Sequence, residues 1–400
     1  MPILLSSADL RPGMRLAESF MVGRRIMLPG GRTLDADLID SILHRFPNAH
    51  FRIGDPVLDA MAEFDDDKHD REVASAATQK IVESLGRVHE RLGGQTDFRS
   101  IDFDAAREAC EQVAAHLRDN PVSAAILAGA MSEGSYLAQH AGNVFYLSMV
   151  LGLSVRDYVS RERRRMTSAR NLSGSVALDL IPLGLNTMFM DIAMVPLQEL
   201  VDRPGPLAPE ELALIRNHPQ AGADMLPDSL PAGVKTVVRT HHENFDGTGY
   251  PDNLPGSKLH VFSRIARICD AFDAATTPHS GKPAKSPARA IWELTRGPRK
   301  GHFDPVLTKV FSSIIQPFPI GAKLRLSDGM GAVVCRYNKK DPFRPTVIVA
   351  FDVHDRPLDR TDLKPPFSLA DRPELKVLAF GLEDLGYLDE SGPQAASLAA

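Results

Sequence analysis

The sequence predicts a multidomain protein in which a central all-α domain is flanked by two small β-rich modules. Its 400 residues exceed the length of one ordinary domain. Apolar residues recur at helical spacing from about residue 100 to residue 318. Short alternating or β-branched runs, separated by Gly and Pro turns, occur at both ends of the chain instead.

The first part of the chain, residues 1–57, is predicted to be an N-terminal β-rich (α+β) module. Pro29, Gly30 and Gly31 separate two short apolar runs, as a turn between strands would. Residues 35–45 carry their apolar side chains on one face, which predicts a short helix.

Residues 58–100 are predicted to form a charged joint and a connecting helix. Residues 63–72 include four Asp and two Glu, and residues 73–92 carry an apolar stripe at spacings of three and four. We expect this stripe to pack against its own domain, and the seam of a homodimer is the alternative.

The central domain, residues 101–320, consists of predicted helices without an internal strand pattern. They cover residues 105–117, 123–130, 135–151, 209–216, 234–242 and 261–275. Residues 321–386 follow with apolar runs at 323–326, 332–336 and 346–351, which predict a small barrel-like β module. Residues 387–400 are small and polar and are predicted to be disordered.

Composition excludes several classes of function. A net charge of -5 argues against a DNA-binding protein that works through a broad basic surface. Three distant cysteines without CxxC spacing suggest neither a disulfide framework nor a thiolate zinc site. No uninterrupted apolar run reaches the ~18–20 residues of a membrane helix. We therefore expect a soluble, cytoplasmic protein without a membrane span.

The most informative segment is the run HHENFDGTGYP, residues 241–251. Neutral imidazole is the commonest protein ligand for transition metals, and carboxylates are its usual companions. Gly247 and Gly249 allow the loop to turn sharply beside a ligand. A surface turn that happens to carry two histidines is the alternative interpretation.

Further side chains of the ligand type stand elsewhere in the chain. His140 and His218 lie in or next to predicted helices, and Asp191 lies between large apolar residues, where a charge is costly to bury unless it is paired. Asp270 and Asp273 share one face of an apolar helix, so a cation is expected near them. Each histidine alone would more often be a packed residue than a ligand.

Taken with these clusters, the chain resembles the HD-GYP domain family, a subset of the HD phosphohydrolases. The run 241–251 matches the family pattern HHExxDGxGYP at every fixed position, and His218-Pro219 with Gly222, residues 270–276 and residues 301–305 match further family segments. The resemblance covers roughly residues 120–318. It implies an HD-type helical fold and hydrolysis of the bacterial messenger cyclic di-GMP.

The resemblance also implies roles for individual residues. Asp191 would bridge two metals, one held also by His140 and Asp270, the other by His218, His241 and His242. By the same resemblance, Asp191 and Asp273 would have catalytic roles. The residues that would contact the substrate are Gly249, Tyr250, Pro251, His279 and Lys282.

Four departures from the family pattern bear on activity. Met190 replaces the histidine of the His-Asp doublet, and a thioether is a poor ligand for the expected ions. Met194 replaces a lysine expected to contact phosphate. Tyr136 replaces a glutamate that holds a third metal in some members, and His279 replaces a basic substrate contact, whereas Lys282 keeps its charge.

These departures predict one well-bound transition metal, iron or manganese with zinc as an alternative, and a weak or empty partner site. Three functions remain open. The chain is a degenerate member with weak or no hydrolysis that regulates by binding a nucleotide or a partner signalling protein; or it is an active cyclic di-GMP phosphodiesterase; or it hydrolyses another phosphate ester.

Overall fold

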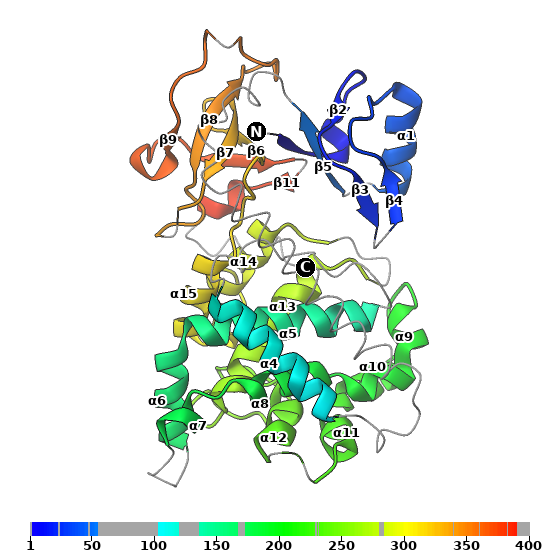
Figure 1. Ribbon diagram of the computed structural model, residues 1–400, viewed down its shortest axis with the longest axis vertical. Coiled ribbons are helices and arrows are strands. Elements are labelled where there is room, and N and C mark those ends of the chain that lie inside the picture. Colours follow the sequence, from blue (N-terminus) through cyan, green and yellow to red (C-terminus); the bar gives the residue numbers. More distant parts are fainter. Residues whose placement is uncertain are drawn as a thin grey trace. The chain divides into compact units, whose positions relative to one another are not determined.

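The computed structural model describes residues 2–22, 25–46, 49–54, 103–119, 136–166, 173–228, 230, 232–279, 284–338, 340–359, 361–381 and 383–389. It divides into two compact units (Figure 1). Unit 1 comprises Met1–Lys68, Ser286–Trp292 and Gln316–Ala400, and unit 2 comprises His69–Lys285 and Glu293–Ile315. The helices predicted at 73–92 and 123–130, the charged joint and Lys282 lie outside the described residues.

The N-terminal part of unit 1 is built from short strands and one helix. Strands β1 (Ile3–Ser6), β5 (His50–Gly54) and β2 (Arg15–Leu16) form an antiparallel sheet in the order β1-β5-β2, and β3 (Phe20–Val22) pairs with β4 (Arg25–Leu28). Helix α1 (Ala36–Arg45) begins where the Asp35 carboxylate accepts a hydrogen bond from the Leu38 N–H at 2.8 Å. The helix predicted at 35–45 is confirmed.

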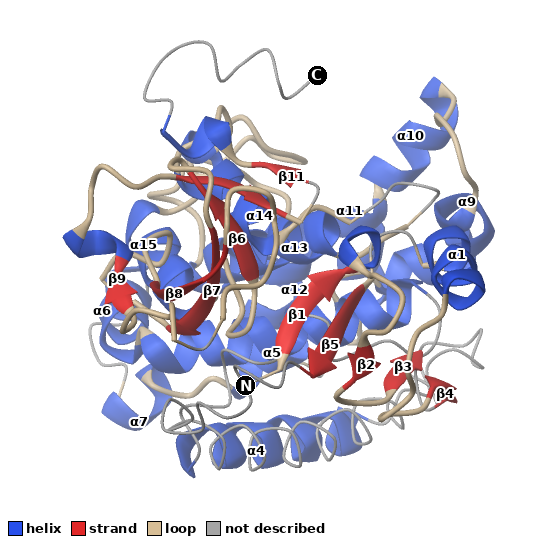
Figure 2. Ribbon diagram, turned by 90° about the horizontal axis from the view of Figure 1, so that it is seen from above, coloured by secondary structure: helices blue, strands red, loops and turns tan. Residues whose placement is uncertain are grey.

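The C-terminal part of unit 1 is a six-stranded antiparallel sheet in the order β11-β10-β6-β7-β8-β9 (Figure 2). The strands are β6 (Lys323–Leu326), β7 (Gly331–Arg336), β8 (Thr346–Phe351), β9 (Phe367–Ser368), β10 (Val377–Phe380) and β11 (Glu383–Asp384). The three predicted runs are therefore strands. Among the described strands the order is linear, so the barrel form of the prediction is not confirmed.

The two β-rich parts share one hydrophobic core rather than forming separate modules. Leu4 of β1 forms a parallel bridge with Ala322, and its N–H donates to the Gly321 carbonyl at 2.8 Å. Phe51 from the first part and Val333 and Ile348 from the last part belong to the same buried cluster. A three-stranded sheet of such short strands has too little apolar surface to be stable alone, which gives a physical reason for the union.

The C-terminal end of unit 1 corrects the predicted tail. Gly386–Asp389 form a short 3-10 helix, η8, and the buried Tyr387 ring packs edge-on against Trp292 with centroids 4.8 Å apart. The ordered chain therefore extends beyond residue 387, where the disordered tail was predicted to begin. Residues 390–400 lie outside the described residues.

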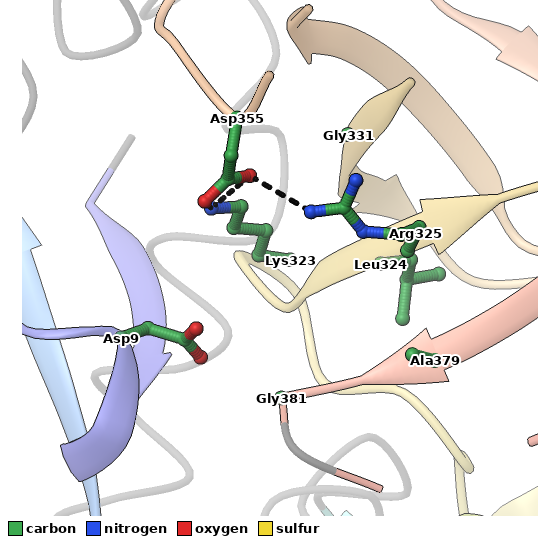
Figure 3. Close-up of a pocket in the computed structure, with 8 residues that line it drawn as sticks. All are labelled: Asp9, Lys323, Leu324, Arg325, Gly331, Asp355, Ala379 and Gly381. Atoms are coloured by element: carbon green, nitrogen blue, oxygen red, sulfur yellow. Dashed lines mark hydrogen bonds and ion pairs between the residues drawn. The ribbon is translucent and has the colours of Figure 1, made fainter. Parts of the chain in front are cut away.

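A pocket of about 40 Å³ lies beside β6 and β10 of unit 1 (Figure 3). Lys323 and Arg325 line it together with two acidic residues, Asp9 and Asp355. The Asp355 carboxylate lies 2.7 Å from Lys323 Nζ and 3.4 Å from Arg325 NH2. Because the charges balance within the pocket, its lining favours neither an anion nor a cation.

Unit 2 contains helices and no strand among its described residues, as the sequence predicted. Its helices are α4 (Phe103–Asp119), α5 (Tyr136–Ser154), α6 (Arg156–Met166), α7 (Gly174–Ala177), α8 (Ile181–Phe189), η5 (Ile192–Leu197), α9 (Gln198–Asp202), α10 (Pro209–Arg216), α11 (His218–Met225), α12 (Ala232–Thr240), α13 (Val261–Thr276) and α15 (Pro305–Ile314). Helix α14 (Pro287–Thr295) is divided between the two units.

Helix α5 is the centre of unit 2. It packs against α8 and α13 (Figure 1). Every residue from Val144 to Gly152 is buried. Helices α4, α5 and α8 approach closely because Gly184 has no side chain: a Cβ there would lie 2.7 Å from Cys110 Sγ and 2.9 Å from the Phe145 ring. This packing brings the ends of α5, α8 and α13 to one site.

One described segment, Gly174–Asp202, is long and apolar enough by composition to cross a membrane. Its most apolar window has a mean hydropathy of 1.5, and 61% of that window is buried. The segment consists of α7, α8, η5 and α9. A buried core helix of a soluble protein meets the same criterion, so this is weak evidence for a span.

A buried ion network ties α13 to α6 and α15. Arg264 donates from NH1 to Asp304 and from NH2 to Glu162, both at 2.7 Å, and the Tyr158 hydroxyl donates to the same Asp304 oxygen at 2.7 Å. The other Asp304 oxygen accepts from the first turn of α15 and caps that helix. The network therefore sets the position of α13, which carries two of the predicted ligands.

Helix α13 begins at His260, whose Nδ1 accepts a hydrogen bond from the Phe262 N–H at 3.2 Å. Only an unprotonated ring nitrogen can accept this bond. Burial, reinforced by the charges of Arg163 and Arg264, lowers the pKa of His260 to about 4.

This histidine should make the stability of the protein depend on pH between about 6.5 and 4. The unfolded chain binds the proton near pH 6.5 and the folded chain only near pH 4, so falling pH favours unfolding across that window. The loss is at most about 3 kcal/mol. His260→Asn keeps a capping acceptor but does not titrate, so urea unfolding at several pH values should show a flatter profile. Identical profiles would contradict this role.

Candidate metal centre

Four predicted ligands from three separate segments meet in one cluster of unit 2, the metal cage: Asp191, His218, His241 and His242. Asp191 follows α8, His218 is the first residue of α11, and the histidine pair follows α12. One ligand atom from each residue can be chosen so that all lie within 4.8 Å of one another. Helices α8, α11 and α12 pack together, which holds the three segments in place.

The imidazoles of His218 and His241 are oriented as ligands are. Each Nδ1 lies 2.6 Å from a backbone carbonyl oxygen, that of Ile215 or Val238, and a carbonyl can only accept. Each Nδ1 therefore carries a proton, and when the ring is neutral its Nε2 holds the lone pair that can bind a metal. The two Nε2 atoms lie 3.0 Å apart. Two lone pairs at this distance repel unless a cation or a shared proton lies between them.

Asp191 has the properties of a metal ligand. Its Oδ1 lies 3.2 Å from His218 Nε2 and 3.7 Å from His241 Nε2. Its Oδ2 is buried without a hydrogen-bond partner among the described residues, 3.5 Å from His140 Nε2. Burial alone would raise the pKa of Asp191, but its contacts with these histidines hold that pKa well below the usual range. A carboxylate with an unsatisfied buried oxygen fits a cation.

The cage histidine His242 is held differently from the other two. Its ring stacks on Tyr250, with centroids 4.9 Å apart and planes at 24°. Burial and the neighbouring His241 hold the pKa of His242 well below its usual value. A neutral imidazole is the form that binds a metal.

The other predicted ligands form a second group, whose atoms pair with one another. His140 Nε2 lies 3.2 Å from Asp270 Oδ1, and His140 Nδ1 lies 2.7 Å from Asp273 Oδ2. Burial lowers the pKa of His140, but these two carboxylates outweigh it and hold that pKa well above the usual value. Asn143 donates to the remaining Asp273 oxygen at 2.7 Å, and Arg267 donates to Asp270 Oδ2 at 3.3 Å. The His140 group is thus satisfied by protein contacts.

The two carboxylates of the 241–251 run stabilise the loop and do not enter the cage. Glu243 accepts from the Asp252 N–H at 2.6 Å and the Leu254 N–H at 3.0 Å. Asp246 accepts from the Thr248 N–H at 3.0 Å. Both acids therefore serve the turn, whose backbone N–H groups need acceptors.

Glycine is required at position 249 in this loop. A Cβ at Gly249 would overlap the backbone of Glu243 and Asn244, so the chain can pass here only without a side chain. The next peptide bond, Tyr250-Pro251, is cis. This close passage places the Tyr250 ring against His242, and Arg216 lies over the same ring at 5.7 Å.

The side chains that depart from the family pattern are buried or packed against apolar and aromatic neighbours. Met194 belongs to an apolar cluster with Leu137, against which Tyr136 packs. Tyr136 also stacks on His140 and on His279, with centroids 5.5 and 4.5 Å apart. Met190 is 1% exposed at the end of α8. The substrate contacts predicted at 249–251 and 279 stay predictions.

Sequence reasoning missed Arg267 and Asn244. Arg267 lies three residues before Asp270 on α13, and its Nε donates to the Asn244 side-chain oxygen at 3.0 Å. The helical spacing of three could have revealed the arginine, since residues i and i+3 share a face. Asn244 was hidden because its partner is distant in sequence.

Comparison with known proteins agrees with this geometry. Residues 161–307 match the family HD_5, described as an HD domain. The chain is 28% identical over 263 residues to cyclic di-GMP phosphodiesterase PA4108 of Pseudomonas aeruginosa, covering 64% of this chain and 58% of that protein. It is 33% identical over 124 residues to a cyclic di-GMP phosphodiesterase of Vibrio cholerae, covering 29% of this chain and 25% of that protein.

In both cases the match spans less than two thirds of the relative's own length. A solved structure, the HDG"Y"P protein Bd1817 from Bdellovibrio bacteriovorus, aligns with a TM-score of 0.44 and 16% identity over 78% of this chain and 98% of that one, a likeness too weak to argue from. Residues 161–307 therefore carry an HD domain, and the family match, the named relatives and the 241–251 run together support its assignment to the HD-GYP family.

Proposed function

We propose that this chain binds cyclic di-GMP, or a closely related phosphodiester nucleotide, at a cage that holds one transition metal, with slow or no hydrolysis. Its role would be that of a nucleotide-responsive regulator. The observation that carries the proposal is the 3.0 Å approach of two Nε2 lone pairs beside the Asp191 carboxylate. The named activities of its relatives supply the class of ligand.

The cage residues would hold iron or manganese, with zinc as an alternative, through three imidazole nitrogens and one carboxylate. When bound, the metal would activate water and stabilise negative charge on phosphoryl oxygens. The backbone carbonyls of Ile215 and Val238 orient His218 and His241 for this task. Tyr250 orients His242 by stacking on its ring.

Weak hydrolysis follows from the state of the His140 group. The efficient metal-dependent cleavage of phosphodiesters commonly uses two metals about 3.5–4 Å apart. Here His140, Asp270 and Asp273 are satisfied by one another and by protein donors. Met190 adds no strong ligand beside them.

A second candidate is an active cyclic di-GMP phosphodiesterase. The unpaired Oδ2 of Asp191, which faces His140 at 3.5 Å, favours it, because this oxygen could serve a second ion. Binding and turnover of cyclic di-GMP separate the two candidates. They should be measured on protein reloaded with iron, manganese or zinc, with the linear dinucleotide as a second substrate. Binding with negligible turnover supports the regulator, rapid turnover supports the enzyme, and the absence of both contradicts the proposal.

Restoring a ligand at position 190 should raise the metal content. Met190→His adds an imidazole next to Asp191, so we expect the count to rise from about one metal per chain towards two, and turnover to rise with it. Elemental analysis of protein purified without chelator measures the count. Met190→Leu, of similar volume, is the matched control and should leave it at about one. An unchanged count in Met190→His would show that the His140 group does not accept a metal.

A further inference from the structure

Arg267 is a buried arginine that the proposed metal chemistry leaves without a role. Its Nε donates to the Asn244 side-chain oxygen at 3.0 Å, and its NH1 donates to Asp270 Oδ2 at 3.3 Å. The guanidinium also lies over the Phe303 ring, 5.3 Å from the centroid. These contacts fix its plane and direction at a side-chain exposure of 15%.

Most of the hydrogen-bonding capacity of this guanidinium is unused. An arginine offers five N–H donors, and the contacts with Asn244 and Asp270 use one each. Among the described residues, NH2 has no partner. Because the side chain keeps some exposure, these donors can reach a ligand that enters from solvent.

The unused donors lie next to the metal cage. Asp270 Oδ2 is shared: Arg267 NH1 approaches it to 3.3 Å and His242 Nδ1 to 3.5 Å. Burial raises the pKa of Tyr250, and the charge of Arg267 acts on that phenol in the opposite direction, as does that of Arg216. The guanidinium therefore borders the His242 and Tyr250 side of the cage.

We propose that Arg267 binds the phosphate of the ligand and takes over part of the positive charge that a second metal would supply. A planar guanidinium with adjacent free N–H groups matches two oxygens of a phosphate. Met194, which replaces a lysine expected to contact phosphate, cannot provide this charge, because its side chain is apolar and packs in an apolar cluster. The proposal rests on the proposed function for the identity of the nucleotide, but not for the binding of phosphate itself.

The test uses the full-length, metal-loaded protein and isothermal titration calorimetry with two probes, inorganic phosphate and cyclic di-GMP. Arg267→Gln should weaken the binding of both by about 10- to 100-fold, the effect expected from losing a charged hydrogen bond. Arg267→Lys, which keeps the charge but loses the fork, should fall between that variant and the wild type. Arg118→Gln removes an exposed arginine of α4 whose one bond among the described residues is to Ala114 of the same helix, and it should bind like the wild type.

The metal count of each variant is the second readout. Arg267→Gln should keep the count of the wild type, since the arginine contacts none of the four cage residues directly; loss of the metal would overturn the proposal in favour of a structural role. Unchanged phosphate affinity in Arg267→Gln would also overturn it, as would a wild type that binds neither probe. If Arg267→Gln does not fold, Arg267→Lys decides: wild-type affinity in a folded Lys variant refutes the need for the fork.

The two proposals fail in different ways. The wild type could bind phosphate but not cyclic di-GMP, while Arg267→Gln loses its affinity for phosphate. This result would refute the proposed nucleotide and support the phosphate-binding role of Arg267. If the wild type and Arg267→Gln bind cyclic di-GMP equally tightly, the proposed nucleotide is supported and the phosphate-binding role of Arg267 is refuted.

Discussion

Replacing Asp191 with alanine should empty the metal cage and lower nucleotide binding or turnover by at least about 100-fold. Changes to residues that merely support metal ligands cost about 10- to 100-fold in affinity or activity, and Asp191 contacts the cage atoms directly. It is also the one carboxylate of the cage. Without it, three imidazoles remain to bind a dication with no anionic partner.

Elemental analysis of protein purified without chelator measures this effect, with a fall from about one metal per chain towards zero. Asp224→Ala is the matched control, because Asp224 lies on α11 with His218 but is exposed and, among the described residues, accepts from Gln220 of the same helix alone. The control should keep its metal. Retention of the full metal content by Asp191→Ala would refute the cage.

Replacing Asp304 with alanine should be the most destabilising single change in unit 2, costing about 3–5 kcal/mol in the free energy of unfolding. Asp304 is 1% exposed, and its removal leaves the Arg264 guanidinium buried with one anionic partner fewer. The same change removes the N-cap of α15. Urea unfolding followed by the helical circular dichroism signal measures the loss.

Two comparisons separate the buried charge from the cap. Asp304→Asn keeps a capping side chain, so it should recover about 1 kcal/mol relative to Asp304→Ala. Arg239→Ala breaks an exposed pair with Asp252 and should cost about 0–1 kcal/mol. Equal losses in Asp304→Ala and Arg239→Ala would show that the buried network contributes no more than a surface pair.

Local pattern was enough for much of the fold. The described helices at 103–119, 136–154 and 261–276 agree with the spacing of their apolar residues, and the strands at 323–326 and 346–351 agree with their alternation or β-branched content. The union of the two β-rich parts could not be predicted this way. It depends on contacts such as that of Leu4 with Ala322, more than three hundred residues apart.

The sequence by itself determined the candidate ligands and the family, because histidine and aspartate carry their chemistry wherever they stand and the 241–251 run is long enough to be specific. Only the tertiary structure decided which of them share a cage. The tertiary structure places His218 and His241 with their Nε2 atoms facing each other, whereas His140 pairs with two carboxylates. In the structure Glu243 bonds to the loop backbone, and Arg267 bonds to Asp270. Distances of a few ångströms between side chains depend on how whole helices pack, and residue type and spacing do not encode them one segment at a time.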